Sequence, residues 1–194
     1  MNTKTARQIE EMKKQTIGVE IEMNSISRSK AAKLASQFFG TGRYKNTADR
    51  NGYCTYSAWD EQGREWKFQK DVSIAGIDSE KCEMVTPILN YSDIETLQEL
   101  VRILRKAGAK SDSTRGCGVH IHIGAKGHTA KTLRNLANIM ASHEQLLIDA
   151  LNLDEVRIRR YCKTVDPRFL EQVNRTKPET VSYTHLTLPT NSRV

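Results

Sequence analysis

The sequence predicts an α+β fold in which a mostly antiparallel sheet has helices packed on it. Short runs of alternating apolar and polar residues are typical of strands with one buried face. Two aromatic-rich runs are separated only by the turn-like residues DEQG, which indicates a hairpin and therefore antiparallel pairing. Longer segments between such runs repeat apolar residues every three or four positions, as amphipathic helices do.

The N-terminal part of the chain predicts a helix followed by a strand. Residues 1–15 are polar and charged, and we expect them to form a helical lead-in. Residues 16–23, TIGVEIEM, alternate with period two. Because successive side chains of a strand leave opposite faces, Glu20 and Glu22 should project from the same face.

The next segment predicts a capped helix and a loop. Ser29 is a suitable N-cap for a helix over residues 30–39, and Gly40 is a suitable residue to end it. Residues 41–52 combine glycine with many polar residues, so we expect a loop there.

Three further strands are predicted in the middle of the chain. Residues 53–59 and 64–69 form the hairpin described above. Residues 82–89, CEMVTPIL, are strand-like, although Pro87 favours an edge strand or a bulge because proline has no N–H to donate.

A strongly amphipathic helix is predicted over residues 92–108. Ser92 and Glu95 have the spacing of a capping box, and Gly108 is suited to end the helix.

The run GCGVHIHIGA, residues 116–125, is the most informative motif. Its alternation predicts a strand on which His120 and His122 share one face. An imidazole on a partly buried face needs a hydrogen-bond partner or a metal, because an unpaired buried polar group costs roughly 1–3 kcal/mol. The alternative is that both rings are exposed or are satisfied by their neighbours.

The C-terminal third predicts helices. Residues 130–152 carry an apolar stripe that we expect to be core, while His128 and His143 should be surface or structural residues. Residues 157–173 should form a basic turn and then a short helix that starts at Asp166.

Composition narrows the class of protein. A chain of 194 residues with 38% hydrophobic and 27% charged residues suggests one globular domain. The net charge of +7 is spread along the chain, so we do not expect nucleic acid as a partner. The four cysteines lack metal-site spacing and suggest reduced thiols. Without a recognisable signal or membrane-spanning run, we expect a cytoplasmic protein with no membrane partner.

The predicted strands supply groups that bind metals. One strand places Glu20 and Glu22 on a face, another places His120 and His122 on a face, and Glu83 opens a third. Magnesium and manganese prefer carboxylate oxygens and accept imidazole occasionally. The pattern therefore favours a site for a hard divalent cation, and the alternative is that Glu20 and Glu22 belong to a solvated face of the strand.

Five segments together resemble the amidoligase family of the carboxylate–amine ligase superfamily, whose fold is similar to the catalytic domain of glutamine synthetase. The resemblance covers residues 16–180 and rests on GVEIEM, KDVSIAG, CEMVTPIL, GCGVHIHIGA and RIRRYCK. It implies a glutamine synthetase-like, curved antiparallel sheet. It also implies an enzyme that uses ATP and Mg (or Mn) to activate a carboxylate as an acyl phosphate, which an amine then converts to an amide or isopeptide.

The same resemblance implies roles for individual residues. Glu20 and Glu22 would be ligands of two magnesium or manganese sites, with Glu83 as a further carboxylate ligand. His120 would ligate a metal, and His122 would contact the ATP phosphates.

Weaker parts of the motifs imply further roles. Gly116 and Gly118 would let the backbone approach the carboxylate substrate. Asp71 would lie near the site, and Arg160 would face phosphate charge. Arg115 replaces the asparagine that precedes the glycines in glutamine synthetases, so glutamate is not implied as the substrate.

Partners and chain limits complete these expectations. We expect a small-molecule or peptide carboxylate, an amine, and a homo-oligomer as a possible assembly. Residues 1–180 would be an incomplete catalytic domain, and residues 181–194, VSYTHLTLPTNSRV, resemble a translated adaptor sequence and would be a non-native tail.

Two functions from other classes stay open on the residues alone. One is a hydrolase or oxygenase that holds a single zinc or iron with His120, His122 and an acid, although the sequence has no HExxH motif. The other is a non-catalytic basic binding module.

Overall fold

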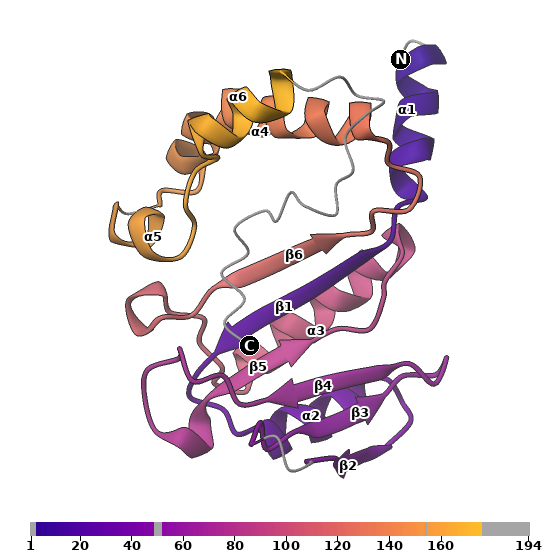
Figure 1. The fold of residues 1–194 in the computed structure, drawn as a ribbon. Coiled ribbons are helices and arrows are strands. Elements are labelled where there is room, and N and C mark those ends of the chain that lie inside the picture. The colour runs from indigo at the N-terminus through magenta and orange to yellow at the C-terminus, as the bar shows by residue number, and fades with distance from the viewer. Residues whose placement is uncertain (1–2, 49–51, 154, 176–194) are drawn as a thin grey trace. The chain divides into compact units, whose positions relative to one another are not determined.

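The computed structural model describes residues 3–48, 52–153 and 155–175 (Figure 1). The chain forms two compact units, Met1–Gly124 and Ala125–Val194. The predicted limit at residue 180 and the predicted tail, residues 181–194, lie outside the described residues.

An antiparallel sheet forms the framework of the first unit and confirms the predicted α+β class. In the described part of the chain its six strands follow the order β2–β3–β4–β5–β1–β6 (Figure 1). All neighbouring pairs are antiparallel. The strands are β1 (Ile17–Met23), β2 (Tyr44–Asn46), β3 (Tyr56–Trp59), β4 (Glu65–Gln69), β5 (Cys82–Val85) and β6 (Val119–Ile123).

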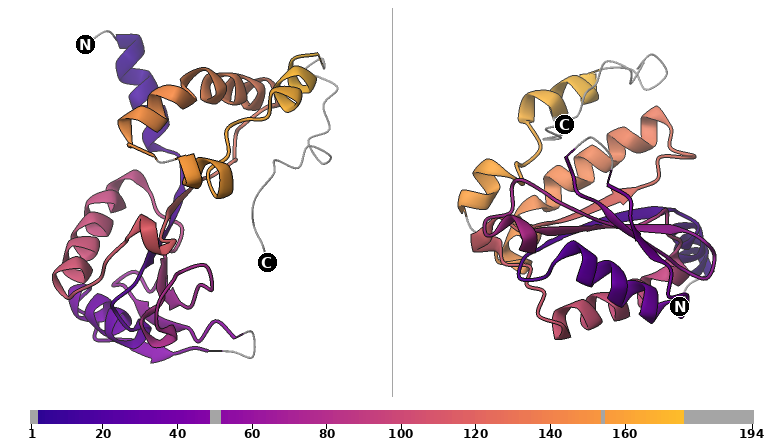
Figure 2. Two further views of the ribbon diagram at one scale, coloured as in Figure 1. Left: turned by 90° about the vertical axis from the view of Figure 1, so that its left-hand side faces the viewer. Right: turned by 90° about the horizontal axis from the view of Figure 1, so that it is seen from below.

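The helices α2 (Arg28–Phe38) and α3 (Ile94–Lys106) cover one face of this sheet (Figures 1 and 2). The core between the sheet and these helices is apolar. Alternate strand positions contribute Val19, Met23, Trp66, Phe68 and Met84, and α3 contributes Leu97, Leu100 and Leu104. Because strand side chains alternate, the other positions of β1, β4 and β5 point to the opposite face. The lead-in helix α1 (Thr3–Lys13), predicted from the sequence, buries no residue.

Two predictions near α2 were wrong in detail. Ser27, not Ser29, is the N-cap, and its hydroxyl accepts a hydrogen bond from the Lys30 N–H at 3.3 Å. Either serine suits a cap, and the extended backbone at Ser27 decides between them. The segment predicted as a loop contains the short strand β2, which pairs with β3.

The prediction for the segment with Pro87 was partly right, and the predicted capping box was wrong. The strand β5 ends at Val85 and lies between β4 and β1 rather than at an edge. The predicted bulge is present, because β1 pairs Glu20 with Val85 and then Ile17 with Leu89, so that the segment with Pro87 has one residue more than β1 between the two pairs. The capping box before α3 is formed by Asn90 and Asp93 instead of Ser92 and Glu95. A 3-10 turn over Tyr91–Asp93 precedes the helix and places the box earlier in the chain.

The second unit consists of α4 (Ala130–Ala150), α5 (Glu155–Arg160) and α6 (Pro167–Arg175), so the predicted basic turn is helical. Reciprocal amide hydrogen bonds of 2.9 and 3.0 Å join Asn138 of α4 to Asn174 of α6.

The apolar stripe of α4 is not the core that the sequence predicted. Leu136 and Leu147 are 47% and 41% exposed. Among the described residues of the second unit only Val173 is buried, because those residues provide few elements to cover the stripe. None of the described helices has the length and apolar character needed to cross a lipid bilayer.

Candidate functional site

The face of the sheet opposite α2 and α3 carries the predicted polar residues. Strand register places Glu20 of β1 opposite His120 of β6, and Glu22 of β1 opposite Glu83 of β5. Gln69 of β4 is the partner of Glu83 on the other side. Four neighbouring strands therefore contribute to one row of polar side chains.

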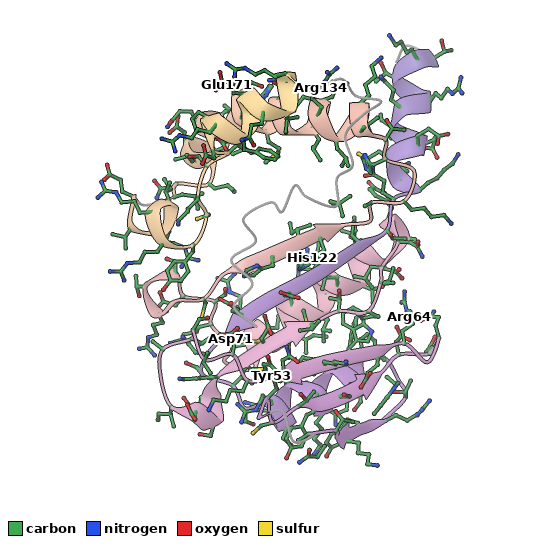
Figure 3. The ribbon with its side chains drawn as sticks, in the orientation of Figure 1. Tyr53, Arg64, Asp71, His122, Arg134 and Glu171 are labelled. Atoms are coloured by element: carbon green, nitrogen blue, oxygen red, sulfur yellow. The ribbon has the colours of Figure 1, made fainter. Side chains whose placement is uncertain are left out.

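Three carboxylates converge within this row and form what we call the acid triad: Glu22, Asp71 and Glu83. One oxygen of each lies within 4.8 Å of the other two. Glu22 and Glu83 are each only 6% exposed. Asp71 follows the end of β4 (Figure 3), and its Oδ1 accepts a hydrogen bond from the Ser73 N–H at 2.6 Å. The sequence suggested only that Asp71 would lie near the site, whereas the fold brings it into direct association with the two glutamates.

Glu83 is the most perturbed carboxyl of the triad. Its pKa is raised from 4.5 to about 7, mainly by burial and also by the neighbouring charges of Glu20, Asp71 and Glu22, while the hydrogen bond from Gln69 opposes the shift. The Gln69 side chain donates a hydrogen bond to Glu83 Oε2 at 2.8 Å. Sequence analysis missed Gln69, although it ends the predicted strand 64–69 only two residues before Asp71. A bound cation would relieve this crowding of negative charge.

The glycine-rich turn before β6 holds Glu22 in place. The Gly118 N–H donates to Glu22 Oε2 at 2.6 Å, and the Gly118 carbonyl accepts from the Glu22 N–H at 3.0 Å. This leaves Glu22 Oε1 as the oxygen that faces His120. The predicted contact of Gly118 with a substrate stays a prediction.

Gly116 allows this turn to approach the loop that carries Asp71. Its φ is +79°, and a Cβ at this position would lie 2.7 Å from the Ser73 carbonyl oxygen. The Ala75 N–H donates to the Arg115 carbonyl at 2.8 Å, which joins the same two segments. The visible role of Gly116 is therefore structural, and its predicted approach to a substrate stays a prediction.

Both histidines of β6 lie beside carboxylates and are exposed. His120 Nε2 is 3.7 Å from Glu22 Oε1, and His122 Nε2 is 3.4 Å from Glu20 Oε1. Their side chains are 56% and 61% exposed, so neither ring is the buried imidazole that the strand pattern allowed. Figure 3 shows His122 on β6.

Arg160 is the one predicted site residue in the second unit, where it lies in α5. Its role toward phosphate stays a prediction.

The chemistry of the acid triad suits a hard divalent cation. Carboxylate oxygens are the ligands that magnesium and manganese prefer. Within the described residues, this group of possible metal ligands contains no imidazole or thiolate. Such a donor set favours magnesium or manganese over zinc.

Comparison with known proteins gives one family. A family model described as "Putative amidoligase enzyme" matches residues 13–193. Neither a curated protein nor a solved structure gives a match.

Proposed function

Because this chain belongs to the amidoligase family, we propose that it is a ligase that uses ATP and magnesium or manganese to join a carboxylate to an amine. The product would be an amide or isopeptide, formed through an acyl phosphate. The observation that carries this proposal is the acid triad, whose ligand oxygens lie within 4.8 Å of one another. The glutamine synthetase-like form of the sheet and the cytoplasmic location belong to the same proposal.

The triad residues would hold the cation. Glu22 is held by the Gly118 N–H, which donates to its Oε2, and Glu83 is oriented by the hydrogen bond from Gln69. A cation bound there supplies electrostatic stabilisation of the charge on the transferred phosphoryl group. Glu20 and His120 lie next to this position in the strand register and are the remaining predicted ligands.

The reaction needs two steps. First, a carboxylate oxygen attacks the γ-phosphorus of ATP, the bond from that phosphorus to the bridging oxygen breaks, and ADP leaves. Second, the amine nitrogen attacks the acyl carbon, the carbon–oxygen bond to phosphate breaks, and the amine loses a proton. Positioning and charge stabilisation supply most of the catalysis in phosphoryl transfer, so no protein nucleophile is required.

We propose that His122 contacts the ATP phosphates. Its exposed ring lies on the same face as the triad and is backed by Glu20 at 3.4 Å. A ring N–H of His122 could therefore donate to a phosphate oxygen. His120 lies closer to the cation position, because its neighbour is Glu22 of the triad.

An assay of ADP release tests the proposal. The purified protein is incubated with Mg²⁺ or Mn²⁺, ATP and a panel of carboxylates and amines. We expect ADP release that depends on both metal and acceptor, and its loss in Glu22→Gln. Glu65→Gln is the matched control, because Glu65 is on the same sheet but accepts a hydrogen bond from Ser57 at 2.7 Å, outside the triad. Absence of both nucleotide binding and ADP release would contradict the proposal.

The two alternative functions predict different results. A hydrolase or oxygenase with one zinc or iron would be purified with that metal bound stoichiometrically and would not bind ATP. A basic binding module would bind nucleic acid in a salt-sensitive manner that Glu22→Gln leaves intact. The all-carboxylate triad favours neither of them.

A further inference from the structure

A second charged cluster lies in the loop between β4 and β5. The ammonium groups of Lys70 and Lys81 both bind the carboxylate of Asp78, with Lys81 Nζ 3.2 Å from Asp78 Oδ1 and Lys70 Nζ against Asp78 Oδ2. The lysine side chains are only 23% and 14% exposed, whereas that of Asp78 is 65% exposed. Two largely buried cations are therefore capped from the solvent side by one exposed carboxylate.

Arg28 adds a third positive charge to the cluster. Its Nη1 donates to the backbone carbonyls of Asp78 and Lys81 at 2.8 and 2.6 Å, and its Nε donates to the Cys54 carbonyl at 3.1 Å. Within residues 3–48, 52–153 and 155–175, Arg28 forms no ion pair with a carboxylate. Three cations are consequently balanced by a single acid, Asp78.

A second ion-pair network in the first unit contains more acids than cations. Arg64 binds both Asp60 and Asp93, at 2.8 and 2.9 Å. Asp60 is 4% exposed and also accepts a hydrogen bond from Trp66. The single cation Arg64 thus has two acid partners, whereas the two lysines at Asp78 share one acid.

The cluster adjoins the acid triad along the chain. Lys70 directly precedes Asp71, and Lys81 lies two residues before Glu83. Lys81 has an extended backbone, with φ −80° and ψ 123°, so its side chain leaves the same face as that of Glu83. The cluster is therefore adjacent to the triad in sequence, and Lys81 shares the face of the triad.

We propose that Arg28, Lys70 and Lys81 form an oxyanion subsite, and that the Asp78 carboxylate is an intramolecular stand-in for its ligand. This inference rests on the proposed function, since the ligand would be either a phosphoryl group of the nucleotide or the carboxylate that is activated. Both offer several negatively charged oxygens to ammonium donors. Solvent screens the ion pairs of an exposed carboxylate, so Asp78 is readily displaced by an incoming anion.

Calorimetric titration without divalent cations tests the subsite apart from the metal. The full chain is titrated with pyrophosphate and, separately, with succinate at low ionic strength. We expect Asp78→Asn to bind one of the anions about tenfold more tightly than the wild type, equivalent to about 1.4 kcal/mol. Tightening for pyrophosphate would identify a phosphoryl subsite, and tightening for succinate a carboxylate subsite.

Further variants show whether the lysines are the donors. Lys81→Met should weaken the binding of that anion and Lys81→Arg should preserve it, in the wild type and in Asp78→Asn alike. Glu99→Gln is the matched control, because it removes an exposed carboxylate that is paired with Arg102 on α3. Circular dichroism and thermal unfolding establish that each variant is folded. If Asp78→Asn does not fold, the subsite is tested by comparing the anion affinities of Lys81→Met and Lys81→Arg.

Two results would overturn the subsite: equal anion affinity in Asp78→Asn and the wild type, or unchanged affinity in Lys81→Met. The proposed function is judged separately by metal-dependent ADP release. If Asp78→Asn tightens anion binding while the wild type releases no ADP, the subsite stands and the ligase proposal fails. If the wild type releases ADP but the variants do not change anion binding, the ligase proposal stands and the subsite fails.

Discussion

Replacing Glu83 with glutamine should stabilise the metal-free protein at neutral and alkaline pH while weakening its metal binding. The side chain keeps its size, and its amide oxygen can still accept the hydrogen bond from Gln69. The change removes one negative charge from a group that already contains Glu22 and Asp71. Affinity for a cation and stability of the empty site should therefore change in opposite directions.

The structure gives the size and sign of the stability effect. Burial, together with the neighbouring carboxylates, raises the pKa of Glu83 from 4.5 to about 7, so ionising it costs at most about 3 kcal/mol more in the folded protein than in the unfolded chain. Solvent screening reduces this to about 1–2 kcal/mol. Because the folded-state pKa is the higher one, this contribution to stability is fully present below pH 4.5 and is lost as the pH rises through 7.

Urea unfolding of chelator-treated protein between pH 4.5 and 8.5 measures the effect. The wild type should lose about 1–2 kcal/mol relative to Glu83→Gln across this range, and the variant should be the more stable protein at pH 8. Titration with Mn²⁺ at pH 8 should show at least tenfold weaker binding by the variant. Glu61→Gln, at an exposed position of the β3–β4 turn, should change neither property. A variant that is less stable at pH 8 and keeps the wild-type pH dependence would refute the reasoning.

Three further substitutions test other parts of the first unit. Gly116→Ala, with φ +79° and its Cβ 2.7 Å from the Ser73 carbonyl oxygen, should lower the free energy of unfolding by about 1–3 kcal/mol and weaken Mn²⁺ binding; an unchanged Tm would contradict this. Arg64→Met leaves the buried carboxylate of Asp60, which is 4% exposed, without its ion-pair partner. We expect urea unfolding to show a free energy of unfolding lower by about 3 kcal/mol. A loss under about 1 kcal/mol would show that the network is dispensable. Gln69→Leu removes the hydrogen bond to a triad carboxylate and should weaken Mn²⁺ binding about tenfold; equal Mn²⁺ affinity would exclude a role in positioning.

Local patterns predicted elements well and their ends less well. The amphipathic pattern of residues 92–108 predicted α3, yet its cap involves Asn90 and Asp93, because serine, asparagine and aspartate can all cap a helix. The stripe of α4 predicted a helix correctly but not its burial. Periodicity shows which side chains share a face, whereas burial depends on whether another element covers that face.

The sequence by itself determined the strands β1 and β6. It also determined that Glu20 and Glu22 share one face of β1 and that His120 and His122 share one face of β6. Strand geometry is local, so the period-two pattern is sufficient for this conclusion. Only the tertiary structure decided that Glu22 lies opposite Glu83, that Asp71 completes the triad and that Asp78 joins two lysines. These contacts depend on strand register and on loop closure between segments that are distant in the chain, and no local pattern specifies either.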